Sequence, residues 1–395
     1  MFKTWNIVGD LLSHDMHGHY QWEATLLVEE LLHRGTAVRI AGHRSIKAEQ
    51  FPGAHVIPAF ALHHEASFSD DERWRHLENF VVHNLDYQKG LHGLDRSIFL
   101  DALTLVLDVS DQQLLGTIRW FSSLPASKPP NVAVILKGQY DWSTKNRSLE
   151  LYPRVWGGCP PFFREHVKLC TRSEMSADRY EQILGVRPHV LPSALGPTEK
   201  EIRCSRERVG PQTGPLAVSF LAGARPERGI AFIPDVVEQC APLGVRFLIQ
   251  ASTRANRMAE TETLRVLRNR SDVHFHEGDL LREEYNDWIA QSVVLLPYSP
   301  ARYQSRSSGV YLEAKSFGSP VIVPAGTWMA EEVSRLGNGL VFEEHNAQAI
   351  VQCIARAQTE LMALRERAAA CAAEHQRAHG VDRCVDAIEA LFTRC

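Results

Sequence analysis

Two segments in the second half of the sequence carry residue types that can bind an anion. The first is the turn at residues 222–229, which contains Gly223, Arg225 and Arg228. Guanidinium groups stay charged at neutral pH and can bind two phosphate oxygens at once. The alternative for this turn is a pair of solvated surface arginines, and the turn taken by itself favours that alternative.

The second segment is a loop of small residues that leads into a short helix. It contains Ser308, Gly309 and Val310, and Glu313 follows about one helical turn later. Free backbone N–H groups and the positive end of a helix bind phosphate, and Gly309 lets the backbone approach closely. Ser308 is also a preferred N-cap residue, and a cap and an anion site use the same free donors. We expect Glu313 to accept hydrogen bonds from ribose hydroxyls, the alternative being a carboxylate in water on the helix surface.

A third segment, residues 14–20, concentrates histidines near the N-terminus. His14, His17 and His19 lie close to Asp15 and Gly18. Such a set suggests a metal site, but the spacing matches no usual zinc pattern. A histidine would also suit proton transfer near neutral pH. A polar loop that contacts a substrate, a metal site and a solvated loop all remain open.

The bulk properties limit the class of protein. The chain has 395 residues, which favours two domains over one core. The apolar content of 44% and charged content of 23% are typical of a soluble globular protein. A net charge of -4, without basic runs, gives no reason to expect a nucleic-acid partner. The eight cysteines form no CxxC pair, which indicates free thiols in a reducing cytoplasm.

No segment reads as a signal peptide or as a membrane span. The N-terminal residues lead directly into an expected strand, and no apolar run approaches the roughly 20 residues that cross a bilayer. We therefore expect a cytoplasmic protein, and a peripheral contact with the inner face of a membrane stays compatible with the sequence. Nothing in the sequence gives the oligomeric state.

Apolar runs alternate with helical patterns along both halves of the chain. This order predicts an α/β protein with two Rossmann-like domains, in which helices cover both faces of parallel sheets. We expect domain boundaries of 1–200 and 215–380, a polar linker at 201–214, and a C-terminal helix at 381–395 that packs back on the first domain. The carboxyl ends of both sheets would face a cleft between the domains. Residues 140–163, rich in aromatics, Pro and Gly, are expected to form an ordered loop.

Three landmarks of the second half together resemble a known family. They are the turn 222–229, the loop and helix 308–314, and the segment 327–332 followed by Gly337 to Leu340. In this order they resemble the nucleotide-binding domain of GT-B glycosyltransferases, in particular the large retaining group that includes sucrose synthase-like and mannosyltransferase-like enzymes. The resemblance covers residues 216–354 well and the first half by order of elements.

The resemblance implies transfer of a sugar from a nucleotide-diphosphate donor to an acceptor hydroxyl, with retention, in glycan or polysaccharide synthesis. Arg225 and Arg228 would stabilise the leaving diphosphate, with Gly223, Arg306 and the amides of residues 308–310 also binding the donor. His17, Gly18 and His19 would lie on the acceptor side or touch the donor phosphate. The acceptor would be a saccharide or a lipid-linked glycan. No metal and no cofactor besides the nucleotide sugar are implied.

One position departs from the family pattern. The family's Glu-x7-Glu motif has its first Glu eight residues before the second, and this chain has Ser305 there. In the family that Glu touches the donor sugar, and Tyr303 and Arg306 are candidates to replace it. Ser305 favours one alternative, a non-catalytic partner subunit that binds nucleotide sugars. A nucleotide-sugar epimerase of the same fold also stays open.

Three further positions have two interpretations each. Asp108 follows the expected strand 103–107 and either caps the next helix or positions an acceptor. Lys137, with Gly138 and Gln139, follows the next strand and is open in the same way. Trp328 either stacks on a sugar or base or packs in the core, and core packing is the commoner fate of a single Trp.

Overall fold

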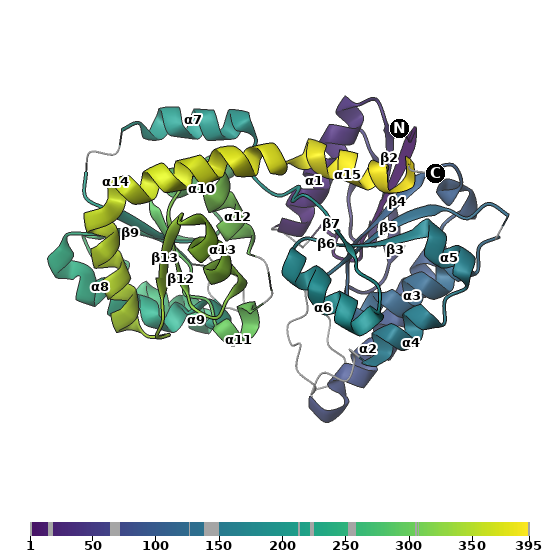
Figure 1. The fold of residues 1–395 in the computed structure, drawn as a ribbon, viewed down its shortest axis with the longest axis horizontal. Coiled ribbons are helices and arrows are strands. Elements are labelled where there is room, and N and C mark those ends of the chain that lie inside the picture. Colours follow the sequence, from purple (N-terminus) through teal and green to yellow (C-terminus); the bar gives the residue numbers. More distant parts are fainter. Residues whose placement is uncertain are drawn as a thin grey trace. The chain divides into compact units, whose positions relative to one another are not determined.

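The structure is a computed structural model that describes residues 2–14, 19–63, 72–125, 127–137, 150–211, 214–221, 225–251, 258–304, 306 and 308–393. The chain divides into two compact units (Figure 1). Unit 1 comprises Met1–Leu195 together with His379–Cys395, and unit 2 comprises Gly196–Ala378. Among the described residues, no helix has the length and apolar character needed to cross a membrane.

Unit 1 is built on a parallel sheet with the order β3-β2-β1-β4-β5-β6-β7. Its strands are β1 (Thr4–Val8), β2 (Ala37–His43), β3 (His55–Phe60), β4 (Leu103–Val109), β5 (Asn131–Leu136), β6 (Val167–Thr171) and β7 (His189–Val190). All seven residues of β4 are buried, which a strand covered on both faces requires. The order reverses between β1 and β4, as in the doubly wound nucleotide-binding fold.

Helices cover both faces of this sheet. They are α1 (His19–His33), α2 (Glu72–His92), α3 (Asp111–Ser122), α4 (Leu151–Gly157), α5 (Pro161–His166), α6 (Glu174–Leu184) and α15 (Val381–Thr393), with short 3-10 turns η1 (Ala48–Gln50) and η2 (Arg96–Phe99). α15 lies beside α1 (Figure 1). Its residues Cys384, Val385 and Ile388 are buried in the core cluster that contains Trp5 and Ala24.

Unit 2 repeats the same plan with the parallel order β10-β9-β8-β11-β12-β13. Its strands are β8 (Ala217–Phe220), β9 (Arg246–Ala251), β10 (Val273–Glu277), β11 (Val293–Leu295), β12 (Val321–Pro324) and β13 (Gly339–Phe342). The order reverses between β8 and β11. The two Rossmann-like α/β units expected from the alternating pattern are therefore present.

The helices of unit 2 surround one large apolar core. They are α7 (Glu199–Val209), α8 (Ile233–Cys240), α9 (Met258–Arg265), α10 (Arg282–Gln291), α11 (Pro300–Tyr303), α12 (Gly309–Phe317), α13 (Trp328–Leu336) and α14 (Ala347–Ala378), with 3-10 turns η4 (Pro226–Arg228), η5 (Ile230–Phe232) and η6 (Ala241–Leu243). α14 contacts α8 and α12.

The segment identified from its composition as a linker, 201–214, is helical as far as Val209. Thr198 and Glu201 form a capping box at the start of α7, and Arg206 and Arg208 occupy its last turn, where cations are favourable. The polar segment is therefore mostly a helix that packs on α10, and the boundary between the two units falls earlier, after Leu195.

The prediction of an ordered loop at 140–163 is wrong for the residues of this range that the structure describes. Residues 151–157 form α4 and α5 begins at Pro161. Tyr152 and Trp156, four residues apart, bury their rings in unit 1, and that spacing is helical. Abundant Pro and Gly concealed this pattern in the sequence.

Candidate functional site

The two predicted anion-binding segments follow neighbouring strands of unit 2. β8 pairs with β11 through Val293 opposite Val218 and Val294 opposite Ser219. Because both strands are parallel, their carboxyl ends meet at the same edge of the sheet. This is the point where the strand order reverses, and ligands of such sheets bind at this point.

A glycine brings the turn η4 into contact with the residues that follow β11. Gly229 ends the turn η4 with φ of 75°, and a Cβ atom there would lie 2.1 Å from the carbonyl oxygen of Pro297. The amide of Ser299 donates to the carbonyl oxygen of Glu227 at 2.8 Å. Only a residue without a side chain permits this approach, so the backbone fixes Arg228 against the segment that follows β11.

Two tyrosines line the place where the segments meet. The Arg228 guanidinium lies over the Tyr298 ring, 5.8 Å from its centroid, and the Tyr298 and Tyr303 rings are 4.5 Å apart. Arg306 lies over the Tyr303 ring at 5.4 Å. Burial opposes the charge of Arg228, but Tyr298, Tyr303 and Glu227 favour it and raise its pKa above the usual value.

Tyr298 also reaches the start of α12. Burial raises the pKa of Tyr298 to about 12, Arg228 opposes this increase, and the Ser308 side chain is close enough to contribute as well. Arg228 and Ser308 therefore both lie beside the side chain of Tyr298. Arg228 Nε is buried and makes no hydrogen bond among the described residues, while the rest of Arg228 keeps some exposure.

Ser308 is the N-cap of α12, as its residue type predicted. Its hydroxyl accepts from the amide of Tyr311 at 3.3 Å. The amides of Gly309 and Val310 have no acceptor within the helix, as at any helix start, and both residues are only half-buried. An anion at this end would meet two amides and the positive end of the helix.

Glu313 is not a carboxylate in water, so that alternative is wrong. Its Oε1 accepts from Arg282 Nη1 at 2.8 Å, and its Oε2 accepts from the Tyr285 hydroxyl at 2.6 Å. The side chain keeps 14% of its surface exposed. Both partners come from α10, which contacts α12.

Several predicted site residues lie outside the described residues. They are His17, Gly18, Gly138, Gln139, Gly223 and Ser305. His19 is the first residue of α1, and its side chain is likewise outside the description. Arg225 is half-buried at the start of η4, with Nη1 3.9 Å from Glu227 Oε1.

The interpretation of Asp108 as a helix cap is wrong, because Ser110 caps α3. Asp108 has φ of 52° where the register between β4 and β5 shifts. Its carboxylate lies 3.4 Å from Arg172 Nη2, and Arg172 also pairs with the buried Glu23. Burial raises the pKa of Glu23 despite the charge of Arg172. The Asp108 side chain is thus part of a buried ion cluster in unit 1.

Lys137 and Trp328 have clear partners. The Lys137 carbonyl oxygen accepts from the Tyr180 hydroxyl at 2.6 Å, and its ammonium lies 5.2 Å from the Tyr20 ring centroid. Trp328 packs edge-on against Tyr311, with the ring centroids 5.3 Å apart, and joins the rim of the core. This agrees with core packing for Trp328.

Sequence reasoning missed Tyr298, Arg282 and Tyr285. Tyr298 stands at the carboxyl end of an apolar run, where a polar aromatic residue could have been noted. Arg282 and Tyr285 are three residues apart on an expected helix and therefore share a face. Only the fold reveals that this face meets Glu313.

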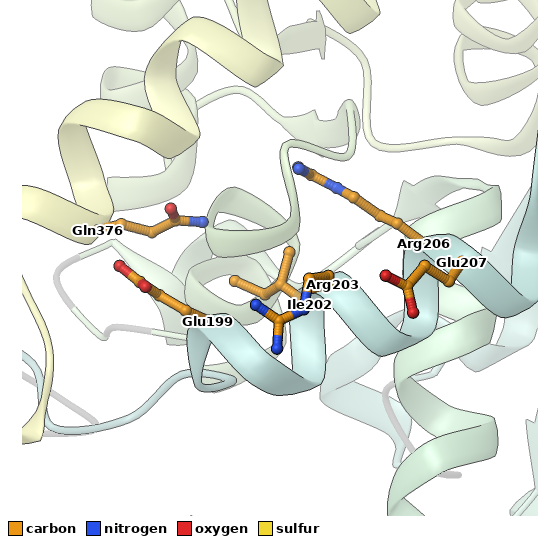
Figure 2. Close-up of a pocket in the computed structure, with 6 residues that line it drawn as sticks. All are labelled: Glu199, Ile202, Arg203, Arg206, Glu207 and Gln376. Carbon is orange, nitrogen blue, oxygen red and sulfur yellow. The ribbon is translucent and has the colours of Figure 1, made fainter.

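One cavity among the described residues lies elsewhere, between α7 and α14 (Figure 2). It measures about 450 Å³, and Glu199, Ile202, Arg203, Arg206, Glu207 and Gln376 line it. Arg206 already donates to the carbonyl oxygen of Phe317, and the lining mixes both charges. None of the predicted site residues belongs to it.

No group of three or more His, Cys, Asp or Glu side chains suited to a metal occurs in the described part of the chain.

Solved structures share this fold over the whole chain. Sucrose-phosphate synthase from Thermosynechococcus elongatus matches with a TM-score of 0.68 at 13% identity, covering 99% of this chain and 98% of that one. Anabaena HepE in complex with UDP and glucose matches with a TM-score of 0.64 at 11% identity, and a glycosyltransferase from Rickettsia africae with 0.62 at 10%. Both cover 100% of the two chains compared.

No protein-family model matches the sequence, and no curated protein sequence does. The structural likeness at such low identity establishes the fold alone. That fold is GT-B, with two Rossmann-like α/β units, as the sequence resemblance predicted.

Proposed function

We propose that this protein is a glycosyltransferase that moves a sugar from a nucleotide-diphosphate donor to an acceptor hydroxyl. The observation that carries the proposal is the contact of Arg228 and Ser308 with one tyrosine, Tyr298, at the switch point of unit 2. A cation and a helix start brought together at such a point form a site for a diphosphate.

The roles follow from the charge that develops during transfer. The bond between the anomeric carbon and the donor phosphate oxygen breaks, and the electron pair leaves with the diphosphate. Arg225, Arg228 and the amides at the start of α12 stabilise that charge. The acceptor oxygen bonds the same carbon, and its proton passes to the leaving diphosphate. With this diphosphate as base, transfer proceeds with retention and without a metal.

The finer features of the proposal are supported by the sequence resemblance. We infer that unit 1 binds the acceptor, a saccharide or a lipid-linked glycan, through the loop that contains His17, Gly18 and His19. A cytoplasmic enzyme of polysaccharide synthesis, in peripheral contact with the membrane, fits such an acceptor. The complex of HepE with UDP and glucose supports a UDP-linked sugar as the first donor to test.

A thermal-shift panel of UDP-, GDP- and ADP-sugars tests donor binding. A ligand at a hundred times its dissociation constant adds about 2.7 kcal/mol to stability and raises the melting temperature. A donor that binds is then incubated with the protein in water, and proton NMR follows release of the sugar. Slow release with the donor's anomeric configuration supports a retaining transferase. Absence of any nucleotide binding by calorimetry would refute the proposal.

The second candidate is a non-catalytic subunit that binds nucleotide sugars. Ser305, where the family pattern has a Glu, favours it. The same NMR experiment separates the two functions, because a binding subunit shows affinity without sugar release. Addition of acceptor mixtures that still yield no transfer would favour the subunit.

A further inference from the structure

Three helices of unit 2 hold the carboxylate of Glu313 in one orientation. Glu313 comes from α12, and its two oxygens accept from Arg282 and Tyr285 of α10 at 2.8 and 2.6 Å. Arg282 is fixed in turn, because its Nε donates to Glu201 of α7 at 3.1 Å. We name Arg282 and Tyr285 the carboxylate clamp.

The clamp uses only part of the acceptor capacity of Glu313. A carboxylate offers about four lone-pair positions, and each donor occupies one, on a different oxygen. One position therefore remains on each oxygen, and the side chain is still 14% exposed. Two acceptors on adjacent oxygens match two hydroxyls on neighbouring carbon atoms, which is the geometry of a ribose 2',3'-diol.

The chemistry of the two clamp residues suits a fixed acceptor. Burial, followed by the Glu313 charge, raises the pKa of the Tyr285 hydroxyl well above its usual value, so it stays a donor at neutral pH. Burial opposes the charge of Arg282, but Glu313 and Glu201 raise its pKa. A permanent cation and a permanent donor are thus both available to orient the side-chain oxygens of Glu313.

The other end of the network is equally fixed. Glu201 accepts from the amide of Thr198 at 2.7 Å and from its hydroxyl at 2.9 Å, so the capping box of α7 anchors it. Thr198 lies two residues after Gly196, where unit 2 begins. A series of hydrogen bonds thus connects Thr198 to Glu313 through the side chains of Glu201 on α7 and Arg282 on α10.

We propose that Arg282 and Tyr285 are positioning residues that orient Glu313 toward the ribose diol of a nucleotide, so that the site selects ribonucleotides over their 2'-deoxy forms. This inference rests on the proposed function, since it requires a nucleotide at the start of α12. The inference goes beyond the proposed function in one respect. It assigns the discrimination between ribose and 2'-deoxyribose to residues on α10 that do not touch the nucleotide.

Calorimetry with paired ligands tests the clamp. UDP, GDP and ADP are titrated first, and any that binds is compared with its 2'-deoxy form in the intact protein. We expect the wild-type protein to prefer the ribonucleotide about 10- to 100-fold, the range of one hydrogen bond to a charged group. Tyr285→Phe should reduce this preference several-fold by weakening ribonucleotide binding, with the affinity for the 2'-deoxy form unchanged.

A double-mutant cycle supplies the decisive comparison. In a Glu313→Gln background, Tyr285→Phe should have no further effect on the preference, because its partner is gone. Arg282→Lys keeps the charge and should lower the preference less than Arg282→Gln. Tyr311→Phe is the matched control on α12, since it removes a buried hydroxyl away from Glu313, and it should leave both affinities unchanged.

The outcomes separate this inference from the function it rests on. If no nucleotide binds, the proposed function and the inference both fail. If nucleotides bind and Tyr285→Phe weakens the two forms equally, or changes neither, the clamp has only a structural role and the inference alone is wrong. Melting temperatures of the variants show that each remains folded at the temperature of titration.

Discussion

At the scale of single residues, Arg228 carries most of the proposed chemistry. Its turn is fixed by Gly229, its guanidinium lies over the Tyr298 ring, and part of the residue remains exposed. An arginine held in this way is already oriented before a ligand arrives. Hydrogen bonds to charged groups contribute about 1.5–3 kcal/mol each, so one fixed guanidinium can decide whether a diphosphate binds.

Arg228→Met should weaken binding of a nucleotide diphosphate about 10- to 100-fold, the equivalent of one charge-assisted hydrogen bond. Met retains an apolar chain against Tyr298, so the fold should persist. Calorimetry with UDP and with uridine, which has no phosphate, separates the contributions. Uridine affinity should not change.

Arg246→Met is the control for loss of one positive charge. Arg246 begins β9, at the amino end of the sheet, and pairs with Gln291 at 2.8 Å. Its replacement should leave UDP binding intact. Equal losses in the two variants would show that net charge, rather than the position of Arg228, governs affinity.

Residue type and order along the chain predicted donor binding by Arg225, Arg228, Ser308 and Gly309, and this role stays a prediction. The partners of Glu313 could not be found in this way, because contact between α10 and α12 is a tertiary fact. Asp108 was misread for a related reason: its left-handed backbone and its pairing with Arg172 depend on a register shift that no local pattern encodes.

At the scale of elements, the close contact of two turns sets the geometry of the site. Gly229→Ala should destabilise unit 2 by more than 2 kcal/mol, since a Cβ atom at 2.1 Å from Pro297 O adds a backbone clash to the 1–2 kcal/mol of the left-handed conformation. It should also weaken UDP binding, because the turn that bears Arg228 must move. Urea unfolding and calorimetry measure the two effects.

Gly244→Ala provides the comparison. Gly244 has φ of 64°, and a Cβ atom there would meet nothing within 4 Å. This variant should show only the conformational cost and normal UDP binding. If Gly229→Ala behaves in the same way, the contact between the two turns does not shape the site.

The contribution of Glu201, at the start of α7, to the free energy of unfolding depends on pH. Burial would raise the pKa of Glu201, but hydrogen bonds from Thr198 and the charge of Arg282 lower it below 4.5. The resulting stabilisation is present above pH 4.5 and is lost as the pH falls through the folded value. Glu201→Gln retains the capping box, so it should cost roughly 1 kcal/mol near pH 7, with the difference vanishing in acid.

Unfolding curves between pH 3 and pH 7 measure this difference. Glu207→Gln, on the exposed face of the same helix, should match the wild-type protein throughout. A gap for Glu201→Gln that grows toward low pH would contradict the assignment of an ionised, paired carboxylate.

Element types were largely accessible from the sequence, whereas elements without a clear period were not. Apolar runs and helical patterns predicted the alternation of strands and helices in both units, and the C-terminal helix α15. The segment of α7 was interpreted as a linker because this short, very polar helix has no clear apolar stripe in its sequence. Only Ile202 and Ser205 of the helix are buried. α4 was missed because its two buried rings lie among Pro and Gly.

At the scale of the whole molecule, the last helix of the described chain, α15, packs on unit 1 although unit 2 precedes it in the sequence. Ile388 is fully buried against a core that contains Trp5 and Ala24. Ile388→Ala should therefore destabilise unit 1 by about 2–5 kcal/mol while UDP binding to unit 2 persists. Hydrogen exchange followed by mass spectrometry locates the loss, and UDP titration checks the site.

Arg383→Ala, on the exposed side of α15, should leave exchange unchanged. Faster exchange in unit 2 rather than in unit 1 upon Ile388→Ala would show that α15 belongs energetically to the other unit. Two Rossmann-like units were predictable from the repeated alternation. Their boundaries were not, because the chain leaves unit 1 before the polar segment 201–214 and returns to it at His379, where tertiary contacts alone mark the change.

The return of the chain to unit 1 has a consequence for biosynthesis. About 180 residues of unit 2 separate Leu195 from His379, so a ribosome needs about 10–40 s to synthesise them at 5–20 residues per second. During that interval the surface of α1 that later receives Ile388 has no cover. The nascent first unit therefore emerges with an apolar surface that stays exposed until α15 is synthesised.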